Sequence, residues 1–104
     1  MTGEQPKRAA MAIPDFEAFA AEQRALGCDE VIERNWKPGT TVGTHTHPFA
    51  VRALVVQGEM WLTVGEQVRH LRAGERFELA QAEPHAERYG AEGATYWAAR
   101  TAPR

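Results

Sequence analysis

The chain has 104 residues, 43% of them hydrophobic, with a formal net charge of -2 and a pI near 6.1. This length corresponds to one domain with a modest core. No basic run exceeds two residues and no stretch approaches the roughly 20 apolar residues that cross a bilayer, so we expect no nucleic-acid or membrane partner. The single cysteine, Cys28, excludes an intramolecular disulfide, and the polar start of the chain does not resemble a signal peptide. A cytoplasmic protein is expected.

The first 28 residues divide into an arm and a helix. Residues 1–12 lack hydrophobic periodicity and are predicted to form a flexible arm. Residues 13–28 carry apolar residues at helical spacing after Pro14-Asp15, and Gly27 is a suitable C-cap. This pattern predicts one short amphipathic helix. The face that should pack on the rest of the domain consists of Phe16, Phe19 and Leu26.

From residue 29 to residue 104 the chain consists of short strand-like runs separated by turn residues. The expected strands are Glu30 to Lys37, Val51 to Gln57, Met60 to Val64, Val68 to Leu71, Arg76 to Leu79, His85 to Tyr89 and Ala94 to Arg100. Turns are expected at Gln57-Gly58 and across 90–93, among other places. Such regular spacing indicates an all-β sandwich or barrel. Trp61 and Trp97 alternate with other apolar residues, so an outer face is expected to pack against a second sheet or a second subunit.

His45 and His47 lie one residue apart in a threonine- and valine-rich segment. If the segment is extended, both side chains leave the same face, about 6.7 Å apart along the strand. Two imidazoles need a third partner to hold a transition metal well, and His85 lies in a comparable turn-then-strand context. The alternatives are surface histidines or core histidines bonded to backbone. His70 is interpreted as a solvated strand residue.

These residues resemble the two metal-site motifs of the cupin superfamily, and small single-domain cupins in particular. The first motif is a glycine, five residues, His-x-His, three or four residues, a glutamate, six residues and a glycine. Gly39, His45, His47 and Gly58 fit it, and Val51 stands where the glutamate belongs. The second motif is a glycine, five residues, Pro-x-Gly, two residues, a histidine, three residues and an asparagine. Gly74 and His85 fit it, whereas its proline, glycine and asparagine are replaced by Ala80, Ala82 and Tyr89.

The resemblance implies a jelly-roll β-barrel that brings His85 beside His45 and His47. It also implies a mononuclear divalent transition metal with open coordination positions, and a homodimer. Imidazole ligands suit Fe, Ni, Cu or Zn better than Mg or Ca. Because the family glutamate is missing at Val51, the ion would keep its full double charge and favour an anionic or bidentate oxygen ligand. Alternatively, the missing glutamate means that metal binding has been abandoned.

The alternation of side chains between the two faces of a strand identifies further candidate site residues. Glu87 and Tyr89 share the face of His85, so either can serve as a proton-transfer group, a hydrogen-bond donor behind the ligands or a weak ligand. A surface glutamate and a core tyrosine are the alternatives. An inward Val51 places Arg52 outward, and a slip of one residue would make Arg52 an anion clamp. Phe49 directly follows the histidine pair and is expected at the pocket mouth.

Three functions compete at this point. The first is a metal-dependent enzyme acting on a small anionic or chelating molecule. Three-histidine cupins include dioxygenases acting on thiols or diketones, so a dioxygenase leads by resemblance, ahead of an isomerase, lyase or hydrolase. The second is a non-enzymatic small-molecule binding or sensing module that needs a partner protein. The third is a homodimeric interaction protein in which the motif is a relic.

Overall fold

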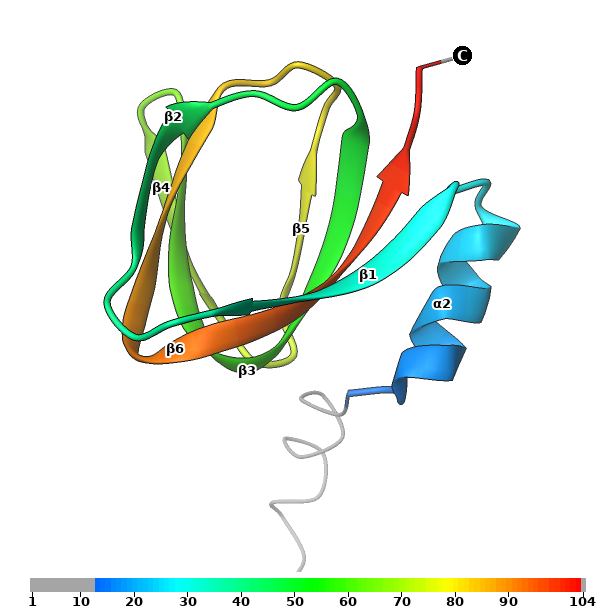
Figure 1. Ribbon diagram of the computed structural model, residues 1–104, viewed down its shortest axis with the longest axis horizontal. Coiled ribbons are helices and arrows are strands. Elements are labelled where there is room, and N and C mark those ends of the chain that lie inside the picture. The colour runs from blue at the N-terminus through cyan, green and yellow to red at the C-terminus, as the bar shows by residue number, and fades with distance from the viewer. Residues whose placement is uncertain (1–12, 104) are drawn as a thin grey trace, which may run out of the picture.

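The computed structural model describes residues 13–103 and contains one helix followed by a rolled antiparallel sheet (Figure 1). Its strands lie in the order β1-β6-β3-β4, with β2 paired to β6 and β5 paired to β3. The elements are α2 (Phe16–Ala25), β1 (Glu30–Trp36), β2 (Thr41–His45), β3 (Ala50–Val64), β4 (Gln67–Arg72), β5 (Arg76–Leu79) and β6 (His85–Thr101). The predicted all-β barrel with one short helix is confirmed. The predicted arm, residues 1–12, lies outside the described residues.

Two strands are much longer than expected. The turns predicted at Gln57-Gly58 and across 90–93 are wrong, because β3 and β6 run without interruption through both places. The β3–β6 ladder instead shifts register between Val55 and Gln57 and again between Gly58 and Met60. Such irregularities bend a strand without ending it. Each long strand therefore contributes to more than one part of the barrel wall (Figure 1).

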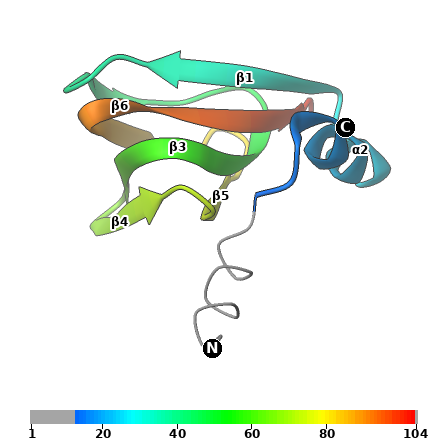
Figure 2. The same ribbon diagram turned by 90° about the horizontal axis from the view of Figure 1, so that it is seen from below.

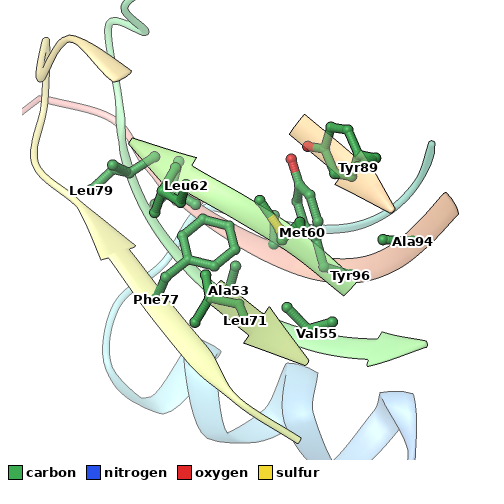
Figure 3. Close-up of a cluster of buried hydrophobic side chains, with 12 residues drawn as sticks. Ala53, Val55, Met60, Leu62, Leu71, Phe77, Leu79, Tyr89, Ala94 and Tyr96 are labelled. Atoms are coloured by element: carbon green, nitrogen blue, oxygen red, sulfur yellow. The ribbon is translucent and has the colours of Figure 1, made fainter. Parts of the chain in front are cut away.

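The core fills the barrel interior with alternate residues from each strand. Val51, Ala53 and Val55 of β3 are buried, and they pack with residues of β4, β5 and β6. Figure 3 shows this cluster, in which Phe77 and Leu79 come from β5 and Tyr89 and Tyr96 come from β6. β5 buries every second residue, as a half-buried strand requires, whereas in β3 Leu54 is buried as well, because it packs with Phe19 and Trp97.

A second, smaller cluster lies on the outer face of the barrel. Phe19 of α2 is buried there with Leu54 of β3 and Trp97 of β6. The Phe16 ring meets the Trp97 ring edge-on, with centroids 5.3 Å apart. The apolar outer face at Trp97 is therefore covered by the chain's own helix, which lies beside β1 and β6 (Figure 2). Leu26, expected on the packing face, is instead 58% exposed.

Asp15 begins the helix, because its carboxylate accepts a hydrogen bond of 2.8 Å from the Ala18 N–H. Replacing Asp15 by alanine is expected to lower the free energy of unfolding by about 1 kcal/mol, the usual effect of losing an N-cap acceptor. Asp15→Asn keeps an acceptor and serves as the control. Urea denaturation measures both variants, and equal losses would show that the cap is not the cause.

Among residues 13–103 no helix is long and apolar enough to cross a membrane.

Candidate metal centre

Three histidines meet at one end of the barrel. His45 is the last residue of β2 and pairs in register with His85, the first residue of β6. One ring nitrogen from each of His45, His47 and His85 lies within 4.8 Å of the others. His47 is not on the same strand face as His45, as the extended reading required, because β2 ends at His45 and His47 lies in the loop that follows. His45 and His47 therefore reach the same site from different backbone contexts, the first from the end of β2 and the second from the following loop.

Backbone hydrogen bonds hold this loop and orient two of the rings. The Ala82 N–H donates to the His47 carbonyl at 2.8 Å, which ties the His47 loop to the loop preceding β6. His45 Nδ1 donates to the Gly43 carbonyl at 2.7 Å, and His85 Nδ1 donates to the Glu83 carbonyl at 2.8 Å. A carbonyl can only accept, so each Nδ1 carries the proton and each Nε2 of the neutral ring presents a lone pair. Fixing the outer ring nitrogen in this way is how proteins aim a metal-ligating histidine.

Glu87 brings a carboxylate to the same point. Its Oε2 lies 3.3 Å from His85 Nε2 and 3.5 Å from His45 Nε2. The other carboxylate oxygen, Oε1, accepts a hydrogen bond from the Tyr89 hydroxyl. Glu87 is buried, with 7% of its surface exposed, and His85 Nε2 is a buried atom without a hydrogen-bond partner among the described residues. The face shared by His85, Glu87 and Tyr89 is therefore the one that alternation predicted, while the part of Glu87 and Tyr89 in catalysis stays a prediction.

This arrangement gathers acceptors with no donor between them. The Nε2 lone pairs of His45 and His85 each lie within 3.5 Å of the same carboxylate oxygen, Glu87 Oε2. Buried acceptors repel unless a cation stands between them, and the cation is either a proton or a metal ion. One proton can satisfy only one pair of these atoms, whereas one metal ion can satisfy all of them. The donor set therefore fits a transition metal.

Burial controls the ionisation of the groups around this point. Burial raises the pKa of Tyr89 far above its usual range, and the neighbouring Tyr96 and Glu87 act in the same direction. Tyr89 therefore stays protonated and acts as a donor to Glu87. Burial, followed by the nearby His85 and His45, lowers the pKa of His47. His47 is thus neutral near pH 7, the form that ligates metals.

A small void of about 30 Å³ adjoins the histidines inside the barrel. Val51 lines it, so the residue at the position of the family glutamate faces the site but offers no oxygen. Phe49 also lines it and stacks on His47 with ring centroids 5.0 Å apart. Arg52 points outward and lies 3.8 Å from the Glu78 carboxylate, so it is not the inner anion clamp.

Sequence reasoning missed two residues that line the same void, Arg34 and Arg100. The sequence signal that could have identified Arg34 is the alternation of inward and outward side chains along its strand. On β1, Ile32 and Trp36 pack against the core, and Arg34 lies between them with the same parity. A charged residue at an inward position of an amphipathic strand marks a candidate site.

His70, interpreted as a solvated strand residue, lies on β4 with 31% of its side chain exposed and also has partners on the surface of the barrel. Its Nε2 lies 2.6 Å from Glu59 Oε1, and its ring stacks on Trp61 at a centroid distance of 4.4 Å. The Arg88 guanidinium lies 4.0 Å from the centroid of the same Trp61 ring. The outer face at Trp61 is therefore occupied by polar side chains of the chain itself, and His70 takes no part in the histidine cluster.

Comparison with known proteins gives a likeness at the level of structure. No protein-family profile and no curated protein sequence matches the chain. A variant of oxalate decarboxylase from Bacillus subtilis superposes with a TM-score of 0.66 and 17% identity, over 79% of this chain and 23% of that one. KdgF from a Halomonas species gives 0.64 and 17%, over 71% of this chain and 68% of that one. A cupin superfamily protein from Desulfitobacterium hafniense gives 0.61 and 15%, over 72% of this chain and 80% of that one.

At these identities the likeness concerns the fold. It agrees with the rolled antiparallel sheet and with the spacing of the glycines and histidines in the sequence. The chain therefore has the fold of the cupin superfamily.

Proposed function

We propose that this chain is a small cupin that holds one divalent transition metal ion and takes a small anionic or chelating molecule at the metal. The ligands are His45, His47 and His85, with Glu87 as an oxygen ligand. The observation that carries the proposal is the set of acceptors around His85 Nε2, which is buried without a hydrogen-bond partner among residues 13–103. Glu87 Oε2, 3.3 Å away, supplies the carboxylate that Val51 cannot.

The chemical types of the donor atoms limit which metal ions the site can hold. Imidazole nitrogen with carboxylate oxygen suits Fe, Ni, Cu and Zn. Such an ion, when bound, supplies a Lewis acid or a binding site for dioxygen. Tyr89 would orient the Glu87 carboxylate, because its hydroxyl donates a hydrogen bond to Glu87 Oε1. Glu87 is the buried carboxylate nearest the ligand nitrogens. Glu87 supplies the only carboxylate among the described residues beside these nitrogens and would serve either as the oxygen ligand or as a base, whereas Tyr89 stays protonated because burial raises its pKa.

An oxygenase is the reaction class to test first, because the resemblance to three-histidine cupins supports it. The enzyme would use Fe(II) and act on a small anionic molecule. Oxygen consumption by the Fe(II)-loaded protein, measured with a panel of small acids and thiols, separates this form of the proposal from a binding or sensing module. Ligand binding without turnover would favour the module.

Metal binding itself is tested by thermodynamic linkage. Fe(II), Ni(II), Cu(II) or Zn(II) at a free concentration of 100 times its dissociation constant is expected to raise the free energy of unfolding by about 2.7 kcal/mol. Mg(II), which prefers an all-oxygen octahedral site, is the control and should have little effect. Denaturation of protein purified without a histidine tag measures the change. If none of the four transition metals stabilises the chain, the proposal is wrong.

A further inference from the structure

Two arginines face the inside of the barrel beside the histidine cluster. Arg34 lies on β1 and Arg100 lies near the end of β6, and both line the 30 Å³ void together with His47, His85 and Glu87. Both are partly buried. Permanent positive charge is seldom placed on the inner face of a small barrel unless something neutralises it.

Neither arginine is fully neutralised by the part of the chain that the structure describes. Arg34 has no carboxylate within 4.0 Å there, and its guanidinium lies 4.8 Å from the centre of the Trp36 ring. Arg100 lies 4.6 Å from the centre of the Phe49 ring, and its ion pair is a long contact of 3.5 Å with the exposed Glu30. Glu87, the acid lining the void, accepts a hydrogen bond from the Tyr89 hydroxyl through Oε1, and its Oε2 lies beside the ring nitrogens of His45 and His85. Little of the positive charge of these two void-lining arginines is therefore neutralised by carboxylates of residues 13–103.

The size of the void limits what can enter. The void of about 30 Å³ admits only a small group between the arginines and the histidines. The two oxygens of a carboxylate match that size, and guanidinium groups bind carboxylates through parallel hydrogen bonds. The Phe49 ring contacts both His47, with ring centroids 5.0 Å apart, and the Arg100 guanidinium, 4.6 Å from the ring centre, so Arg100 and one metal ligand adjoin the same side chain.

We propose that Arg34 and Arg100 form a carboxylate-binding subsite, and that the molecule taken at the metal centre is a short carboxylic acid with a second oxygen or sulfur donor. The carboxylate lies against the arginines and the second donor lies toward the histidines. This inference rests on the proposed function for the second donor only. The carboxylate subsite depends on the arginines alone.

Calorimetric titration with glycolate tests the proposal, and glycolamide is the matched neutral probe. Metal-loaded protein should bind glycolate at least about tenfold more tightly than glycolamide. Arg34→Gln and Arg100→Gln should each remove about tenfold of the glycolate affinity, which corresponds to about 1.4 kcal/mol, and should leave the metal content unchanged. Arg52→Gln, which removes the outward arginine, should change neither value.

A separate titration keeps the two proposals distinguishable. Acetate and acetamide are compared on the metal-free protein, where preference for acetate that disappears in Arg34→Gln supports the subsite even if no metal binds. Equal binding of the charged and neutral probes, no binding of either, or glycolate affinity unaffected by both arginine substitutions would overturn the subsite. Loss of metal from the arginine variants would also overturn it, because it would make them part of the metal site. A wild type that stays empty of metal contradicts the proposed function instead.

Discussion

Replacement of His85 by alanine is expected to lower the affinity for the transition metal by more than about 100-fold. Substituting a residue that only orients a metal ligand typically costs 10–100-fold, and removing a ligand should cost more. His85 is 2% exposed, its Nδ1 is fixed on the Glu83 carbonyl, and its Nε2 faces Glu87 Oε2. Reconstitution, dialysis against a competing chelator and metal analysis by mass spectrometry measure the effect on tag-free protein.

The chain contains a matched control for this experiment. His70 is a partly exposed histidine whose Nε2 lies 2.6 Å from a glutamate oxygen, but it lies with Glu59 and Trp61 outside the cluster. His70→Ala should therefore keep the metal, and circular dichroism should show both variants folded. A His85 variant that holds metal as tightly as the wild type would exclude this residue as a ligand. Equal losses in both variants would point to a general effect on the fold.

The shared face of His85, Glu87 and Tyr89 could be predicted from the sequence because it depends on short-range geometry. His85, Glu87 and Tyr89 lie in one uninterrupted strand, and the pleat alone places them on one face. The approach of His85 to His45 was expected only because the motifs resemble those of cupins, which implied a jelly roll. Val51 was also placed inward correctly, with Arg52 outward.

The meeting of Arg34 and Arg100 at one void could not be predicted in the same way, although alternation marks Arg34 as an inward residue. Their meeting at one void depends on the pairing of β1 with β6, where Arg34 lies opposite Tyr96 and Glu30 lies opposite Arg100. That register joins residues more than 60 positions apart, and no local pattern specifies it. The covering of Trp97 by α2 is a similar case, since an apolar outer face does not reveal which element will cover it.

The wrong turn predictions arise from glycine, whose local signal is the same in a turn and in a bent strand. Gly65, in the β3–β4 turn, has φ of 60°, whereas Gly58 and Gly93, inside long strands, have φ of 77° and 74°. Glycine adopts all of these conformations at little cost. Whether the chain reverses or continues depends on the partner strand, which the local sequence does not show.

Gly58→Ala is expected to destabilise the barrel by about 4 kcal/mol. The left-handed conformation contributes roughly 1–2 kcal/mol for a residue with a Cβ, and overpacking contributes about 1–3 kcal/mol more. A Cβ on Gly58 would overlap the Gly93 carbonyl oxygen and lie 2.9 Å from Ala94 Cα, which are backbone atoms of β6 that cannot rotate away. The two longest strands would have to separate where they bend. Urea denaturation followed by tryptophan fluorescence measures the loss.

Gly65→Ala separates the two contributions. Gly65 also has a left-handed φ, of 60°, but nothing lies within 4 Å of the position of its Cβ. Its substitution should therefore cost only the conformational part, roughly 1–2 kcal/mol. The difference between the two variants isolates the close approach of β3 to β6, the feature that lets each long strand serve two parts of the wall. If Gly58→Ala and Gly65→Ala lower the free energy of unfolding equally, that approach is not what makes glycine necessary at position 58.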